Sequence, residues 1–152
     1  FTAVGWGLPD DLRPLLGKGV THTGRVDDVR PYLGRASVVV VPLRIGSGTR
    51  LKVLEALAMG KAVVSTKIGC EGLEVKHGEH LLIASDPAEF AKSVLRLMAR
   101  PEDAAALGRR GRELVERRYG WDRSVARLHE FHESIFDARS SLSRVTAEAA
   151  AR

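Results

Sequence analysis

The chain has 152 residues, 44% of them hydrophobic and 28% charged, and its 24 Lys and Arg residues exceed its 19 Asp and Glu residues to give a net charge of +5. This composition is typical of a soluble globular protein and excludes disorder, collagen and coiled coil. The length suits one domain of about 100 to 200 residues. Because the excess positive charge is spread along the chain, it indicates only a mild preference for anionic ligands.

Strands and helices alternate through the first two thirds of the chain, a pattern typical of a parallel α/β sheet. The apolar runs predict strands at 2–5, 20–23, 37–41, 62–65 and 81–84, with helices at 10–16 and 29–36. The run at 37–41 is a serine followed by four valines. Since it is apolar on both faces, it predicts a strand that is covered on both sides.

Helices dominate the remainder of the chain. Asp86 is a suitable N-cap, with Pro87 at the first helical position and Glu89 completing a capping-box pattern. A second helix is predicted from Pro101 to Gly120, and a third starts at about Asp122. The apolar residues of the third helix recur at helical spacing and are Val125, Leu128, Phe131 or His132, and Ile135. The polar, Ala-rich stretch 140–152 has no periodic apolar face and predicts a frayed tail.

Cysteine usage and hydropathy bear on the compartment. Cys70 is the only cysteine, so it cannot form an internal disulfide and has no partner for activation. The longest apolar run, 38–43, is far shorter than the roughly 20 residues that a membrane span needs, and no signal segment is recognisable. We expect a cytoplasmic location, or a peripheral one at the inner membrane for a full-length protein.

The segment 42–60, PLRIGSGTRLKVLEALAMG, carries the clearest functional signal. Its glycine-rich loop lies between the carboxyl end of a strand and the amino end of a helix, where open α/β sheets bind ligands. Backbone N–H groups and the helix dipole favour phosphate there. The loop residues are Gly46, Ser47 and Gly48, and the nearby cations are Arg44, Arg50 and Lys52. Neither GxxxxGK[ST] nor GxGxxG is matched, so glycines that only turn the chain are an open alternative.

Glu55 is the one charged residue in the otherwise apolar run 53–59. We expect this helix to be largely buried. A buried carboxylate needs hydrogen-bond donors, which the vicinal hydroxyls of a ribose would supply. The alternative is a pair with Lys52 or a bond to nearby backbone. Similarly, Glu71 and Glu74 either cap the following segment or face the same ligand.

Other polar clusters favour structural roles. The histidine pairs His77 with His80 and His129 with His132 lack further ligands at metal-binding spacing, so we expect no metal. The Arg-rich stretch 109–118 alternates with glutamates and lacks interleaved aromatic residues, which favours a solvated helix face over a nucleic-acid site.

Six segments in order, VTHTGRVDDVRPYL, ASVVVVPL, GSGTRLKVLEALAMGKAVVST, IGCEGL, HLLIA and YGWDR, carry a family resemblance. The chain is similar, from residue 1 to about 136, to the C-terminal, donor-binding half of group 1 (family four) retaining glycosyltransferases of the GT-B fold, and among them to exopolysaccharide-associated sugar transferases. The resemblance implies an α/β, Rossmann-like three-layer domain with a parallel sheet and C-terminal helices. It also implies sugar transfer from a UDP or GDP sugar, a substrate, with no cofactor.

The resemblance further implies roles for single residues. The family's E-x7-E motif places its second glutamate, which binds the donor ribose, on Glu55. Its first glutamate, which contacts the donor sugar, falls on Ser47, a departure that leaves the sugar open. Backbone near Gly48 would lie by the diphosphate and the 24–26 turn near the base. The donor-binding set is Gly46, Ser47, Gly48, Thr49, Arg50, Lys52, Glu55 and Arg25; no catalytic residue is assigned.

The resemblance also bears on domain organisation. It implies a donor-binding domain at 1–139 that lacks the family's first strand and helix, with 1–7 matching the second strand. An N-terminal domain would hold the acceptor, so we expect this chain alone to transfer no sugar. The absent strand is central in the order 3-2-1-4-5-6, so we expect a gap or rearrangement between the strands at 2–5 and 38–41. A nucleotide-sugar epimerase of the same fold and a non-catalytic nucleotide-sugar binding module are the alternatives.

Overall fold

The computed structural model describes residues 1–8, 10–46 and 48–150, with the side chains of residues 11 and 137–150 left out. The chain forms two compact units, Phe1–Arg112 and Glu113–Arg152. The donor-binding domain predicted at 1–139 therefore comprises the first unit and part of the second, and its extent stays a prediction. Within the described residues, no helix is both long and apolar enough to cross a membrane.

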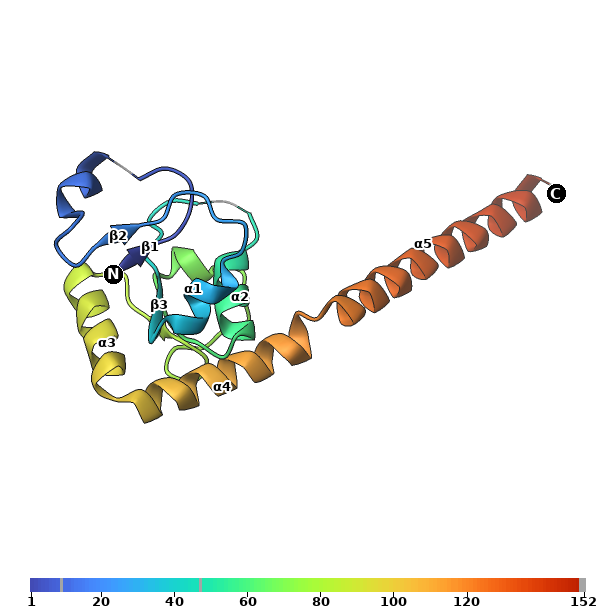
Figure 1. Cartoon of the computed structure of the whole chain (residues 1–152). Coiled ribbons are helices and arrows are strands. Elements are labelled where there is room, and N and C mark those ends of the chain that lie inside the picture. The colour runs from blue at the N-terminus through green and yellow to red at the C-terminus, as the bar shows by residue number, and fades with distance from the viewer. Residues whose placement is uncertain (9, 47, 151–152) are drawn as a thin grey trace. The chain divides into compact units, whose positions relative to one another are not determined.

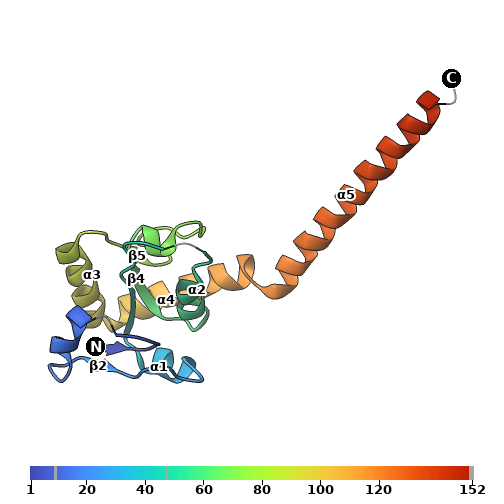
Figure 2. The ribbon, with the colours of Figure 1, turned by 90° about the horizontal axis from the view of Figure 1, so that it is seen from above.

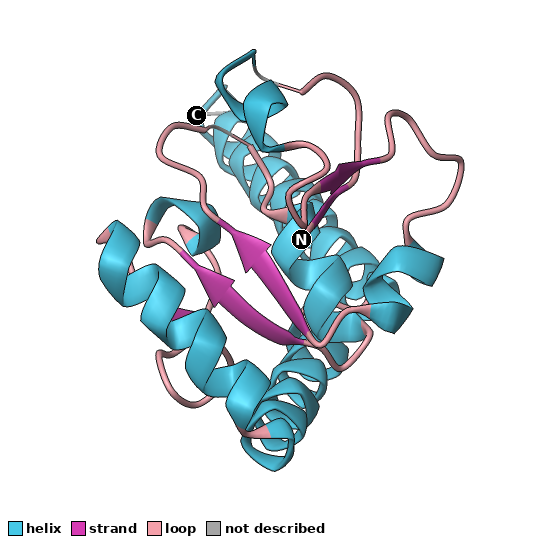
Figure 3. Ribbon diagram, turned by 60° about the vertical axis from the view of Figure 1, so that its left-hand side comes forward, coloured by secondary structure: helices cyan, strands magenta, loops and turns pink. Residues whose placement is uncertain are grey.

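The first unit contains two small parallel sheets (Figure 3). In one, β1 (Thr2–Ala3) pairs with β2 (Thr21–His22). In the other, β3 (Val38–Val41) pairs with β4 (Ala62–Ser65), which pairs with β5 (Leu82–Ile83). All five predicted strands are confirmed, with β1, β2 and β5 shorter than the apolar runs that predicted them.

The strand order breaks between β1 and β3. Within the described chain, β1 pairs with β2 alone and β3 with β4 alone, so the order is β2-β1, a break, and then β3-β4-β5. The expected gap is confirmed. The prediction that 37–41 is covered on both sides is confirmed, since the helices Leu51–Ala58 and Pro87–Ala99 both contact β3. Because β3 is also an edge strand with one row of backbone groups unpaired, Val38, Val39 and Val40 are half-buried and Val41 is buried.

Helices cover both faces of the β3-β4-β5 sheet (Figures 1 and 2). On one face, α2 (Leu51–Ala58) contacts β3 and β4; on the other, α3 (Pro87–Ala99) contacts the same strands. One buried cluster joins this second face to α3 and to the start of α4 (Pro101–Arg118), and its members are Ala62, Val64, Leu82, Leu97, Ala104 and Leu107. The predicted three-layer architecture is thus confirmed.

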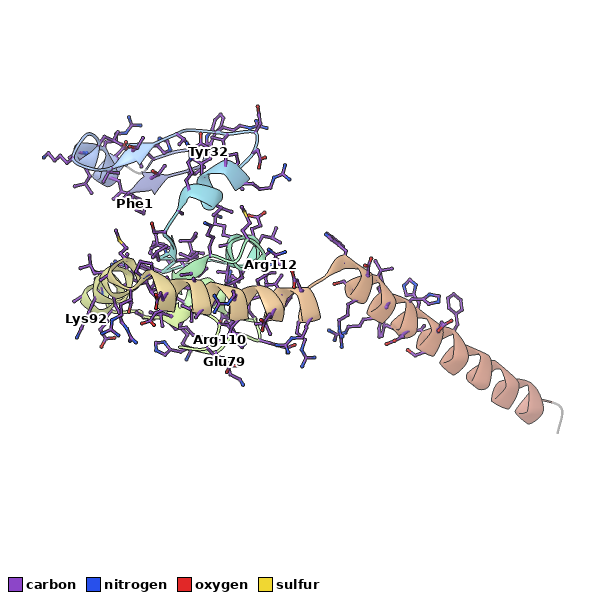
Figure 4. All side chains as sticks on the ribbon, turned by 60° about the horizontal axis from the view of Figure 1, so that its bottom comes forward. Phe1, Tyr32, Glu79, Lys92, Arg110 and Arg112 are labelled. Atoms are coloured by element: carbon purple, nitrogen blue, oxygen red, sulfur yellow. The ribbon has the colours of Figure 1, made fainter. Side chains whose placement is uncertain are left out.

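The other helices follow their local sequence signals. The predicted helix at 10–16 is a 3-10 helix, η1 (Asp10–Leu15), and that at 29–36 is α1 (Arg30–Arg35). The Asp86 carboxylate caps α3 by accepting hydrogen bonds from the backbone N–H groups of Ala88 and Glu89, at 2.9 and 3.0 Å. Arg110 of α4 donates from Nε to the carbonyl oxygen of Glu79 at 2.7 Å, holding the loop before β5 (Figure 4 labels both residues).

In the second unit, α5 (Trp121–Ala150) is one continuous helix. The predicted frayed tail at 140–152 is therefore wrong through residue 150, while residues 151 and 152 lie outside the described residues. The physical reason lies in residue type, because this stretch has no Gly or Pro and is rich in Ala, the residue that most favours a helix.

Candidate functional site

The glycine-rich loop connects β3 to α2, as predicted. Gly48 has a φ of +88°, a left-handed conformation that glycine adopts without the steric cost of a Cβ. The chain then enters α2 through Arg50, whose carbonyl accepts from the N–H of Val53 at 3.0 Å. The loop thus lies at the carboxyl end of β3 and the amino end of α2. Ser47, the predicted sugar contact, lies outside the described residues.

Arg50 is buried and its guanidinium holds the loop. Nη1 donates to the carbonyl oxygen of Gly48 at 3.1 Å, and Nη2 donates to that of Gly46 at 3.3 Å and to Glu71 Oε2 at 3.2 Å. Its Nε is buried and, within the described chain, has no partner. The sequence analysis placed Arg50 with Arg44 and Lys52 as charge near the loop, but both terminal nitrogens of Arg50 donate to the protein itself.

Glu55 is exposed, so the prediction that it lies on a buried helical surface is wrong. The reason is that α2 is two-sided: Val53, Ala56 and Leu57 are buried, while the opposite side is exposed. Among the described residues, neither Lys52 nor any backbone group bonds to the Glu55 carboxylate. The alternative that such a bond occupies it therefore has no support, and its two oxygens are available to a ligand.

The ends of β3 and β4 are joined by a hydrogen-bonded cluster that sequence reasoning missed. Thr66 Oγ1 donates to the carbonyl oxygen of Leu43 and accepts from the N–H of Gly69 at 3.0 Å. Gly69 lies in η2 (Ile68–Cys70), where an added Cβ would be 2.4 Å from Ser65 Oγ and 2.8 Å from the carbonyl oxygen of Val41. In this cluster, η2 therefore packs closely against the ends of β3 and β4. The one sequence signal was the pair of hydroxyl residues ending an apolar strand.

Cys70 follows Gly69 and is buried. Its Sγ lies 3.4 Å from the carbonyl oxygen of Thr66. Burial raises the pKa of the Cys70 thiol above its ordinary value, and a hydrogen bond with Ser65 and the charge of Arg50 only partly oppose this. A raised thiol pKa leaves less reactive thiolate at a given pH.

We expect iodoacetamide to modify Cys70 much more slowly in the native protein than in protein unfolded in urea, at any pH from 7 to 9. Burial both blocks access and lowers the thiolate fraction. Mass spectrometry of timed samples measures the rate, with a Cys70→Ser variant as the blank. Equal rates in native and unfolded protein would show that η2 does not bury this thiol.

The other three predicted cations, unlike Arg50, are exposed. Arg44 and Lys52 flank the loop and are exposed. Arg25 is also exposed, but it follows β2 in the other sheet, after Gly24, whose carbonyl oxygen accepts from the N–H of Gly5 at 3.1 Å. In the described part of the chain, none of these three cations has an ion pair or hydrogen bond. All three follow the carboxyl ends of parallel strands or start the helix after one.

His77 and His80 make structural contacts. His80 is buried, and its Nδ1 accepts from the backbone N–H of Lys76 at 3.1 Å. His77 Nδ1 accepts from the N–H of Ile83 at 2.9 Å. Across the described residues, no group of three or more His, Cys, Asp and Glu side chains could hold a metal ion.

The first unit is a three-layer, Rossmann-like α/β domain. Its glycine-rich loop leads from a parallel strand into a helix, which is where such domains bind ligands. The family is also defined: the model of the glycosyl transferases group 1 family matches residues 1–100, and the chain belongs to this family.

Individual proteins are similar to parts of this chain. An uncharacterised 44.6 kDa protein in the cps region of Klebsiella pneumoniae is 43% identical over 58 residues, which are 38% of this chain and 15% of that protein. Sucrose-phosphate synthase from Thermosynechococcus elongatus matches the structure with a TM-score of 0.76 at 27% identity, over 90% of this chain and 38% of its own. Anabaena Alr3699/HepE in complex with UDP matches with a TM-score of 0.75 at 17% identity, over 88% and 40%. The match thus spans well under half of each relative.

Proposed function

We propose that this chain is the donor-binding part of a glycosyltransferase and binds a nucleoside diphosphate sugar at the carboxyl ends of β3 and β4. The observation that carries the proposal is the loop at 46–50, which turns on a left-handed Gly48 directly into α2, with the exposed Glu55 about one turn further on. Such a junction offers backbone N–H groups and the positive end of a helix dipole to a phosphate. Family membership and the UDP bound to the similar Anabaena protein support a nucleotide ligand.

Each part of the donor then has a matching group. The diphosphate lies by the backbone of residues 46–50, near Arg44 and Lys52, which have no partner among the described residues. Glu55 accepts hydrogen bonds from the ribose hydroxyls, and the turn that carries Arg25 lies near the base. The resemblance to the family assigns the sugar contact to Ser47.

In sugar transfer, the bond between the sugar and the diphosphate breaks and negative charge develops on the leaving diphosphate. Loop amides, the α2 dipole and the exposed cations stabilise this charge. The acceptor is held by a separate domain of a full-length protein, and the donor is UDP- or GDP-linked. The cps-region relative supports a role in exopolysaccharide or cell-surface glycan synthesis.

A thermal-shift panel of UDP, GDP, ADP and their sugars tests the proposal. A ligand at 100 times its dissociation constant stabilises the folded state by about 2.7 kcal/mol. We expect UDP or GDP and the matching sugar nucleotide to raise the melting temperature, and the nucleoside alone to do so much less. If no nucleoside diphosphate raises it, the proposal is wrong.

A further inference from the structure

Beside the glycine-rich loop, the structure holds a second carboxylate, that of Glu71. Glu71 directly follows η2, and its Oε2 is 3.2 Å from Arg50 Nη2. The two partners differ in exposure: the Arg50 side chain is 7% exposed and the Glu71 side chain 71%. The cation of this pair is therefore inside the protein, and the carboxylate is presented to solvent at the loop.

Both sides of the pair are held in place. The Arg50 guanidinium also bonds to the carbonyl oxygens of Gly46 and Gly48, so it moves with the loop. On the other side, η2 is fixed by the Gly69 N–H bond to Thr66 Oγ1 and by the close approach of Gly69 to the end of β3. Glu71 is thus positioned relative to the loop by backbone contacts on two elements.

Pairing with the buried Arg50 guanidinium accounts for one carboxylate oxygen of Glu71. Among the described residues, the other oxygen, Oε1, has no partner. A hexose has several hydroxyl groups that need acceptors, and a carboxylate has two oxygens that can accept from adjacent hydroxyls. Of the described carboxylates near the loop, Glu55 is assigned to the ribose, and position 47 carries a neutral serine. Glu71 is the carboxylate whose position is tied to the loop by a buried cation.

We propose that Glu71 binds hydroxyl groups of the donor's sugar and so helps to select which sugar is bound. This inference rests on the proposed function. Arg50 is the positioning residue: it holds one oxygen of Glu71 and leaves the other toward the ligand.

The test is Glu71→Gln in the protein at its full length, titrated by calorimetry with UDP, UDP-glucose, GDP and GDP-mannose. Glutamine retains one oxygen acceptor for Arg50 but loses the charge and the second acceptor. We expect affinity for the bare diphosphate to stay within about twofold, and affinity for the sugar nucleotide that binds wild type to fall about 10- to 100-fold. Glu89→Gln, at an exposed glutamate on α3, should change neither affinity.

Two results would overturn the inference while leaving the proposed function intact. One is an unchanged affinity of Glu71→Gln for the sugar nucleotide. The other is an equal loss of affinity for the diphosphate and for the sugar nucleotide, which would mean that Glu71 only stabilises the conformation of the loop. If wild type binds none of the four probes, the proposed function fails and this inference fails with it. Equal melting temperatures of Glu71→Gln and wild type serve as the folding control.

Discussion

Replacing Gly108 with alanine should destabilise the first unit by about 1 to 3 kcal/mol, the usual cost of overpacking, or by more. A Cβ at Gly108 of α4 would lie 2.0 Å from the carbonyl oxygen of Gly60 and 2.7 Å from its carbon. These are backbone atoms of the turn between α2 and β4, where Gly60 has a φ of +67° and its N–H bonds to the carbonyl of Leu57. The turn cannot shift without disturbing both elements.

Helix propensity acts in the opposite direction, since alanine is favoured over glycine in a helix interior by about 1 kcal/mol. Gly34→Ala in α1 isolates that effect, because an added Cβ there meets only Met59 Cε, at 4.0 Å. Urea unfolding followed by circular dichroism should therefore show Gly34→Ala as stable as wild type or slightly more stable. A Gly108→Ala variant as stable as wild type would show that α4 does not pack on the turn as described.

Glu55→Gln should weaken nucleotide binding roughly 10- to 150-fold and leave the fold intact, since a hydrogen bond to a charged group is worth about 1.5 to 3 kcal/mol. The exposed carboxylate of Glu55 has no partner in the described chain, so its loss removes no internal contact. If Glu55 binds the ribose, the substitution therefore lowers the affinity for the nucleotide and leaves the stability of the fold unchanged. Calorimetric titration with the nucleotide found by thermal shift measures it.

Glu89→Gln is the matched control, because Glu89 is an exposed helical glutamate on α3, away from the loop. It should bind the nucleotide as wild type does. Should Glu55→Gln also bind like wild type, Glu55 is not part of the site. A loss of melting temperature in Glu55→Gln would instead point to a structural contact.

The fold could be predicted where local signals are strong. The valine run of β3, the alternation of strands and helices, and the Asp86 cap each have a local physical cause and are confirmed. The edge position of β3 could not be predicted from the valine run itself. An apolar sequence does not show whether a neighbouring strand pairs with each edge of the strand. The helix through residue 150 was not predicted because the stretch 140–152 has no periodic apolar face. The helix propensity of its residues alone favours a helix there.

The site was predicted as a loop with nearby charge but not as a hydrogen-bonded arrangement. Sequence spacing indicates that Gly46, Gly48 and Arg50 are close together. It does not indicate that Arg50 is buried or that its partner is Glu71, 21 positions further on. Such a contact depends on how η2 returns to the end of β3, and that path is set by tertiary packing at Gly69.

Hydrogen–deuterium exchange of the full-length protein, with and without a nucleoside diphosphate sugar that binds it, tests the central claim most directly. The claim is that the donor lies on the loop and the start of α2. We predict that the ligand slows exchange most in the peptides that span residues 43–56, with a smaller effect around residues 24–26. Unchanged exchange at 43–56, or protection confined to other segments, would contradict the account.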